Sequence, residues 1–118
     1  ADLTHVIADI IDNPLPQMIY TWDAFSDDEK IVLSLLAETL PDGIDYATAG
    51  KLRASVQAGD YPVNLSENTI RLTLEEMFRR ELLDKDAGDG FRFKIDLFRL
   101  WIRRSHSIWQ VVKEVRTL

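Results

Sequence analysis

Basic side chains are concentrated near the C-terminal end of the sequence, at a spacing that could bind phosphate groups. The stretch FRFKIDLFRLWIRR, residues 91–104, contains five of them: Arg92, Lys94, Arg99, Arg103 and Arg104. Guanidinium and ammonium groups bind phosphate through charge-assisted hydrogen bonds, so this cluster is a candidate contact for nucleic acid or another anionic partner. The same residues could instead form a solvated face that balances acids elsewhere in the chain.

Charge is distributed unevenly along the 118 residues, whose net charge is −6. Residues 1–50 hold ten acids and one base, whereas residues 91–118 hold seven bases and two acids. The two ends could attract each other within the fold, or the basic end could meet an anionic partner. The internal or solvated interpretation is favoured.

A second candidate set lies on a helix predicted from about Ser66 and on a hairpin that follows it. The favourable members of this set are Asn68, Arg71, Arg79, Arg80 and Lys85. Seven acids share the two elements with them: Glu67, Glu75, Glu76, Glu81, Asp84, Asp86 and Asp89. Because phosphate neutralisation supplies most of the affinity for DNA, this composition disfavours DNA binding while leaving it possible.

Signatures of catalysis are missing from the sequence. It has no glycine-rich phosphate loop, no HExxH motif and no cysteine, and His5 and His106 lack the spacing of metal ligands. We therefore expect that the protein is not an enzyme and that it needs neither a cofactor nor a metal. No apolar run approaches the ~18 residues that span a bilayer, so we expect a cytoplasmic protein without a membrane partner.

Helical spacing of apolar residues predicts the elements that must position these side chains. A first helix over residues 1–12 carries the stripe Leu3, Val6, Ile7 and Ile10. A short helix is predicted from Pro16, and Ser26 with Glu29 forms a capping box that starts a helix ending near Leu40. These three helices account for the acidic part of the chain.

The second half of the sequence predicts two more helices, a hairpin and a closing helix. After a short extended piece at residues 44–47, Thr48 is expected to cap a helix that ends at Gly59, before the helix from about Ser66. Strands over residues 82–86 and 91–95 flank a turn whose glycines are expected to supply positive φ angles. Asp96 is then expected to cap one long helix that runs to the C-terminus.

This order predicts a mostly α fold, a winged helix-turn-helix with a three-helix core and a two-stranded β-hairpin wing. We assign residues 25–118 to this domain, including its long C-terminal helix, and residues 1–24 to an N-terminal helical extension. The helix from about Ser66 occupies the recognition position of such a domain.

Two stretches of the chain carry a resemblance to a known family. FRFKIDLFRLWIRR after a hairpin, and TWDAFSDDEKIVLSLLAE at residues 21–38, resemble the winged-helix domain that follows the ATPase core in AAA-like and STAND-type signalling ATPases of bacteria and archaea. The resemblance implies a regulatory module that packs on the ATPase core of its parent chain or binds another protein, with catalysis elsewhere. Walker motifs and a Met-His-Asp sequence are both missing here, which excludes ATP hydrolysis by these residues and puts direct nucleotide contact in doubt.

The alternative function is that of a winged-helix transcription factor that binds DNA, with dimerisation through its terminal helices as one possible form. The closing helix bears on this question because its apolar stripe is longer than a small domain can easily bury. The stripe that could form packing or an interface comprises Trp101, Ile108, Trp109, Val112 and Val115. The stripe of residues 1–12 is its favoured cover, and a second copy or the ATPase core are the other candidates.

Overall fold

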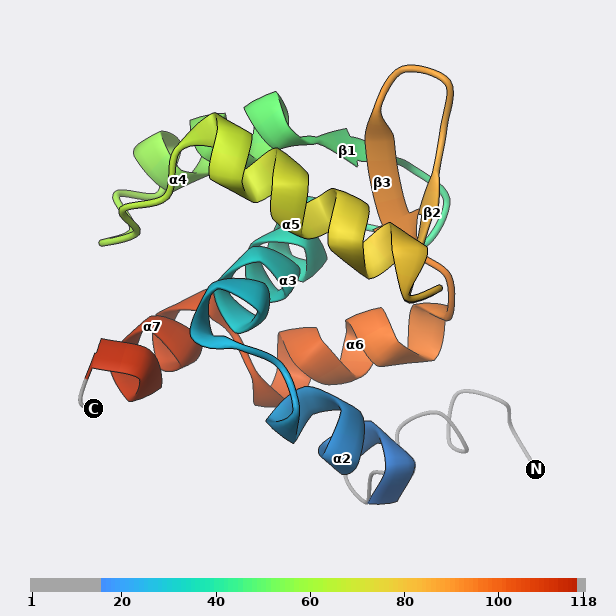
Figure 1. Ribbon diagram of the computed structural model, residues 1–118. Helices are drawn as coiled ribbons and strands as arrows, with labels where there is room; N and C mark the ends of the chain where they lie inside the picture. The colour runs from blue at the N-terminus through green and yellow to red at the C-terminus, as the bar shows by residue number, and fades with distance from the viewer. Residues whose placement is uncertain (1–15, 117–118) are drawn as a thin grey trace.

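The computed structural model describes residues 16–116, which form a mostly helical fold with a small antiparallel sheet (Figure 1). In chain order its elements are α2 (Pro16–Asp23), α3 (Asp27–Thr39), β1 (Ala47–Thr48), α4 (Ala49–Ala58), α5 (Glu67–Arg79), β2 (Leu83–Lys85), β3 (Gly90–Phe93), α6 (Asp96–Ser105) and α7 (Ile108–Arg116). The mostly α prediction is confirmed. The predicted helix over residues 1–12, with its apolar stripe, lies outside the described residues.

Polar residues cap the starts of α3, α4 and α5, and the sequence predicts two of these caps, Ser26 and Thr48. The Ser26 hydroxyl accepts the amide N–H of Glu29 at 3.2 Å, and the Glu29 carboxylate accepts the amide N–H of Ser26 at 2.8 Å. Thr48 and Ser66 cap α4 and α5 with their hydroxyls in the same way. Each such cap stabilises a helix by about 1 kcal/mol, because it satisfies an amide that the helix leaves unpaired.

Strand β3 lies in the middle of a three-stranded sheet of order β1-β3-β2. Its Phe91 faces Ala47 of β1 on one side and Lys85 of β2 on the other, and both pairings are antiparallel. The prediction of a two-stranded hairpin is therefore incomplete. The extended piece before α4 supplies a third strand, which pairs the edge of β3 that the hairpin alone would leave open.

The hairpin turn is built by aspartates, so the prediction that its glycines supply positive φ is wrong. Asp89 adopts φ 60°, a left-handed conformation that Asp tolerates better than most residues. The Asp86 carboxylate accepts the amide N–H groups of Gly88 at 2.9 Å and Gly90 at 2.7 Å. Gly90 serves packing, because a Cβ there would lie 2.8 Å from Cβ of Tyr46 beside β1.

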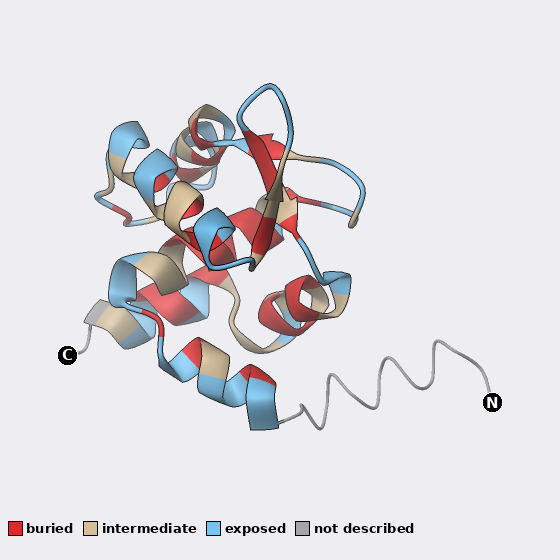
Figure 2. Cartoon of the chain, turned by 45° about the vertical axis from the view of Figure 1, so that its right-hand side comes forward, coloured by how far each residue is buried: buried red, intermediate tan, exposed pale blue. Residues whose placement is uncertain are grey.

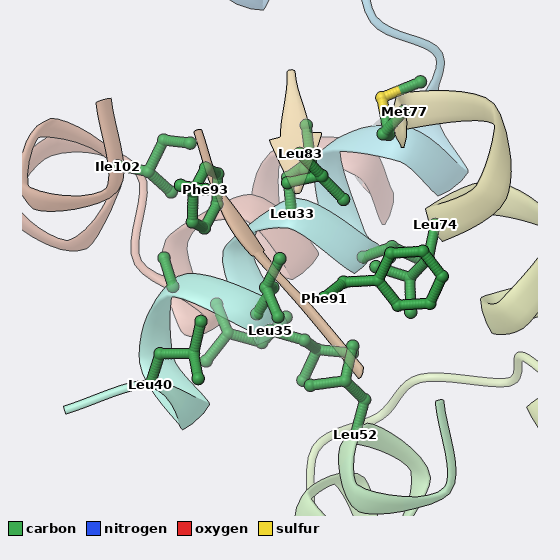
Figure 3. Packing of buried hydrophobic residues seen from close by; sticks show 14 of the residues in the cluster. Leu33, Leu35, Leu40, Leu52, Leu74, Met77, Leu83, Phe91, Phe93 and Ile102 are labelled. Atoms are coloured by element: carbon green, nitrogen blue, oxygen red, sulfur yellow. The ribbon is translucent and has the colours of Figure 1, made fainter. Parts of the chain in front are cut away.

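The core surrounds α3, whose residues 32–37 are all buried (Figure 2). Helices α4, α5, α6 and α7 and the sheet each turn an apolar face toward α3, as expected of a helix that is buried on nearly all sides. Figure 3 shows buried side chains of these elements gathered around β3. They include Leu35, Leu52, Leu74, Phe91 and Ile102.

The C-terminal segment forms two helices, so the prediction of one long helix is wrong. The chain turns at residues 106–107, where the amide of His106 closes α6 on the Ile102 carbonyl at 2.7 Å. The Ser107 carbonyl then accepts the amide of Val111 at 2.9 Å in the first turn of α7. Asp96 does not cap α6 either, because the cap position is Ile95.

This turn decides what covers the predicted tail stripe. It directs α7 back along α3 (Figure 1), which buries Trp101, Ile108 and Val112 and partly buries Val115. Trp109 remains 55% exposed, contrary to the prediction that it packs with them. Helices α6 and α7 both contact α3, so each half of the stripe packs against the same helix from its own side of the break.

Two other side chains expected inside are exposed. Alternation over residues 91–95 predicts that Ile95 shares the inward face of Phe91 and Phe93, but β3 ends at Phe93 and the alternation ends with it. Helical spacing with Ile70, Leu74 and Met77 predicts that Phe78 lies on the buried face of α5, yet Phe78 is 40% exposed near the C-terminal end of that helix.

Replacing the two C-terminal tryptophans should therefore have unequal effects on stability. Trp101 is 2% exposed and stacks on Phe98 with 5.7 Å between ring centroids. Trp101→Ala should lower the free energy of unfolding by about 3–5 kcal/mol, because it leaves a cavity in the core. Trp109→Ala, the matched control, should cost less than about 1 kcal/mol. Urea denaturation followed by circular dichroism measures both, and equal losses would contradict the assignment of Trp109 to the surface.

His106 fixes α2 to the turn between α6 and α7. Its ring stacks on Trp22 with 4.3 Å between centroids and meets Trp101 edge-on at 4.8 Å. The Nδ1 atom of His106 is buried and has no hydrogen-bond partner within residues 16–116. Burial lowers the pKa of His106, which the carboxylates of Glu114 and Asp23 oppose and the ammonium group of Lys30 reinforces.

This lowered pKa predicts a pH-dependent stability. Because the pKa of His106 is lower in the folded protein than its ordinary value near 6.5, protonation favours the unfolded chain. Above pH 6.5 His106 has no such effect, and as pH falls below 6.5 its protonation destabilises the fold. His106→Phe keeps a stacking ring without a titrating group. Between pH 7.5 and 5 the parent protein should lose stability relative to His106→Phe in urea denaturation. A constant difference between them across this range would contradict the prediction.

Candidate interaction surface on helix α5 and the hairpin

The outward side of α5 and the adjoining hairpin form the surface on which the sequence placed its recognition residues. We call this the α5–hairpin surface and define it by Asn68, Arg71, Leu72, Phe78, Arg79, Arg80 and Lys85. The members of this surface on α5 are exposed because Ile70, Leu74 and Met77 form the buried stripe of that helix. Strand β2 packs beside α5, which brings Lys85 next to the same helix.

Arginines at the C-terminal end of α5 are paired with glutamates. Arg79 contacts the Glu76 carboxylate at 2.8 Å, and Arg80 contacts the same carboxylate at 3.3 Å. Arg80 also reaches Glu29 at the start of α3, at 3.2 Å. Hydrogen bonding from Arg79 is the main reason that the pKa of Glu76 is lowered. The positive charge that would attract phosphate is thus largely matched within the protein.

Lys85 on the hairpin is paired in the same manner. Its ammonium group lies 2.6 Å from the Glu75 carboxylate of α5 and 3.4 Å from Asp89, and 5.6 Å from the centroid of the Phe91 ring. The hydrogen bond to Glu75 is the main cause of the raised pKa of Lys85. The hairpin lysine therefore ties the hairpin to α5 and offers little free charge.

Asn68 and Arg71 lie on the exposed first half of α5, where the Arg71 guanidinium donates to the Asn68 side-chain carbonyl. They are the members of the α5–hairpin surface best placed to read a nucleic acid. The whole segment 67–93 nevertheless holds seven acids and five bases, a net charge of −2. Its overall charge does not favour a polyanion.

Apolar side chains complete the α5–hairpin surface. Leu72 is 56% exposed and Phe78 is 40% exposed, although both belong to a helix with a well-defined buried face. Aromatic residues and arginine are enriched where proteins contact one another, so the exposed Phe78 next to Arg79 is compatible with a protein interface. The sequence pattern missed this feature, because it assigned Phe78 to the core and did not single out Leu72.

The basic cluster of residues 91–104 is not one surface, because its two arginines on the inner side of α6 are used within the fold. Arg99 is 4% exposed, forms an ion pair with Asp96 at 2.5 Å, and donates to the Leu40 carbonyl at 3.1 Å. Arg103 donates to the same carbonyl at 3.4 Å. Arg99 therefore cannot be a partner contact in this structure, contrary to the candidate role that the sequence gave it.

The remaining members of that cluster point in different directions. Arg92 lies over the Tyr46 ring, 4.4 Å from its centroid, and donates to the Ile44 carbonyl at 2.7 Å. Lys94 and Arg104 are exposed, Lys94 after β3 and Arg104 near the end of α6. One sequence signal could have revealed the internal use of arginine, since α3 has three acids in its first turn and no base in its last.

A cavity of about 280 Å³ lies between α2, the end of α5 and the link from β3 to α6. Met18, Leu82 and Phe98 contribute apolar walls, and Lys94 lines it as well. Periodicity alone could not indicate this cavity, because its walls come from three separate parts of the chain.

Two features are absent from the described part of the chain, a metal-binding cluster and a membrane-spanning helix. Residues 16–116 contain no cluster of three or more histidines and carboxylates that could hold a metal ion. No helix in this range has the length and apolar character to cross a lipid bilayer. Comparisons with protein-family models, with curated proteins and with solved structures found no match.

The internal role of Arg99 predicts a large effect on stability when its charge is removed. Arg99→Met keeps an unbranched stem but leaves Asp96 and the Leu40 carbonyl without this donor, and should cost about 2–4 kcal/mol. Lys94→Met removes an equal charge from an exposed position and should change the urea midpoint little. Similar midpoints for the two variants would contradict the structural role of Arg99.

Proposed function

We propose that this chain is a non-catalytic winged-helix module that acts by binding another protein through its α5–hairpin surface. One observation carries the proposal. Arg79, Arg80 and Lys85 are already paired with acids of the same fold, while Leu72 and Phe78 are exposed on the same surface. Such a surface gains more from an apolar protein partner than from a phosphate backbone.

The order of the elements supports the winged-helix assignment. Helices α3, α4 and α5 precede the β2–β3 hairpin, and α6 follows it. In this reading α4 and α5 are the helix-turn-helix pair, α5 occupies the recognition position, and the hairpin is the wing. Strand β1 before α4 completes the sheet without changing this order.

DNA binding would require the paired cations to change partners. If Arg79 and Lys85 bound phosphates, Glu76 and Glu75 would lose their counter-charges while facing a polyanion. Ion pairs on a surface are individually weak, so the obstacle lies in the net charge of the segment and in the carboxylates left behind.

A DNA-binding winged helix remains the second candidate, because Asn68 and Arg71 occupy exposed positions on α5. Both residue types recognise base edges in the major groove, Asn at adenine and Arg at guanine. A homodimer could strengthen such binding by doubling the contacts.

The proposed partner is the ATPase core of a parent chain, or another protein that the module regulates. This part of the proposal comes from the resemblance of residues 21–38 and 91–104 to winged-helix domains of AAA-like and STAND-type ATPases. The module would transmit the state of that core through contacts, without taking part in ATP hydrolysis.

Site-specific cross-linking can distinguish the two candidates. A photoreactive p-benzoylphenylalanine introduced at Leu72 or Phe78, in the cells that produce the protein natively, should yield one discrete adduct common to both positions. The adduct should resist nuclease and be degraded by protease. The same group at Asp45, an exposed loop position, is the control and should not yield this adduct.

DNA binding in solution provides the opposing outcome. At physiological salt, duplex DNA should bind with a dissociation constant no tighter than about 10 μM, as for non-specific contacts. Nanomolar binding by fluorescence anisotropy that is lost in Arg71→Ala or Arg79→Ala would overturn the proposal and establish the transcription-factor alternative.

A further inference from the structure

A second hollow, of about 270 Å³, lies away from the α5–hairpin surface, between α3, α4 and the loop after α4. Ala58 forms an exposed apolar wall above the fully buried Leu35, and Glu38, Thr39 and Ser55 contribute oxygen atoms. Tyr61 lines the same hollow from the loop. Nothing in the proposed function uses these residues.

The position of the Tyr61 ring is built into the end of α4. Gly59 has φ −87°, which any residue adopts, so its backbone does not require glycine. A Cβ at this position would lie 2.5 Å from Cε2 of Tyr61. The left-handed conformation is instead taken by Asp60, with φ 53°, and the Tyr61 amide bonds to the Val56 carbonyl at 3.1 Å. The glycine therefore makes room for the ring.

Trp109 holds the Tyr61 ring from α7. The ring centroids lie 5.0 Å apart at an interplanar angle of 62°, an edge-on arrangement. Trp109 is the exposed residue that the sequence placed in the core, so this contact explains how its indole is used. Together Gly59 and Trp109 fix an aromatic ring beside the hollow.

The polar lining of the hollow consists of hydrogen-bond acceptors with one negative charge. Among residues 16–116, no basic residue lines it. The Thr39 hydroxyl donates to the Ser55 oxygen at 3.3 Å, so its own oxygen can still accept. Burial and, second, the charge of Glu38 raise the pKa of Tyr61, and both residues line the same hollow.

We propose that this hollow binds a lysine side chain of a partner protein. The apolar stem of lysine fits along the exposed Ala58 and the Tyr61 ring, as lysine stems do on apolar surfaces. Its ammonium group, with three donors, is then offered to the Glu38 carboxylate and to the hydroxyl oxygens of Thr39 and Ser55. The Tyr61 ring adds a cation–π contact. An acidic ligand would meet Glu38 without any counter-charge.

The inference rests on the proposed function, because it assumes that the module binds a protein, and it adds a chemical requirement for that partner. The acidic first half of the chain, with ten acids and one base in residues 1–50, favours the approach of a basic segment.

Nuclear magnetic resonance titration of the whole chain with Nα-acetyl-lysine methylamide tests the site. Amide signals of Glu38, Ser55 and Tyr61 should shift and saturate with a dissociation constant of about 1–10 mM, as expected for a single side chain. Glu38→Gln should weaken binding by about tenfold or more. Asp84→Asn, which removes an equal charge from the hairpin, should leave binding unchanged.

Gly59→Ala provides a second variant whose backbone remains unstrained. It should displace the Tyr61 ring and weaken binding by about fivefold or more, while the spectrum elsewhere shows a folded protein. Unchanged affinity in this variant would overturn the role of the ring.

Two further probes separate the alternatives. Equal affinity for the neutral Nε-acetylated probe would overturn the ammonium site. Spermidine binding more than about tenfold tighter than the lysine probe would overturn the assignment to a protein partner and favour a free polyamine. Absence of shifts with every probe would also reject the site. That result would leave the cross-linking from Leu72 and Phe78 intact, and loss of the cross-link would leave the titration unchanged, so the two failures are distinguishable.

Discussion

The buried guanidinium of Arg99 is the constraint on which the arrangement of the other elements depends. A charged group that is removed from water must find its counter-charge and its hydrogen-bond acceptors inside the protein, or the fold is strongly destabilised. Arg99 finds them in Asp96 and in the carbonyl of Leu40, where α3 ends. Helix α3 has no base in its own last turn, so α6 supplies the cations that its C-terminus favours.

This requirement fixes the start of α6 against the end of α3 and thereby positions the sheet. Gly43 shows how closely the segments approach, because a Cβ there would lie 2.4 Å from the Asp96 carboxylate. Strand β3 enters α6 within three residues of Phe93, so the hairpin has little freedom of direction. Phe91 and Phe93 then enter the core while β1 and β2 pair on either side of β3.

Pairing of charges within the fold also determines which groups the outer surface offers to a partner. Three cations of the α5–hairpin surface are held by acids of the fold: Arg79 and Arg80 by Glu76, and Lys85 by Glu75. Leu72 and Phe78 are exposed on the same surface, and the acid Glu38 lies beside the α3–α4 hollow. Both features favour a protein partner, one by burial of Leu72 and Phe78 and the other by attraction of a cationic side chain.

The sequence by itself determined the features that depend on neighbouring residues. Ser26 and Thr48 cap the helices they were expected to cap, and apolar spacing located α3, α4 and α5, because period and capping act within one or two turns. Only the tertiary structure decided three other features. They are the hydrogen bond from Arg99 to the carbonyl of Leu40, 59 residues away, the presence of a third strand, and the exposure of Trp109. These depend on contacts between distant segments, whose geometry a local pattern of residue types does not encode.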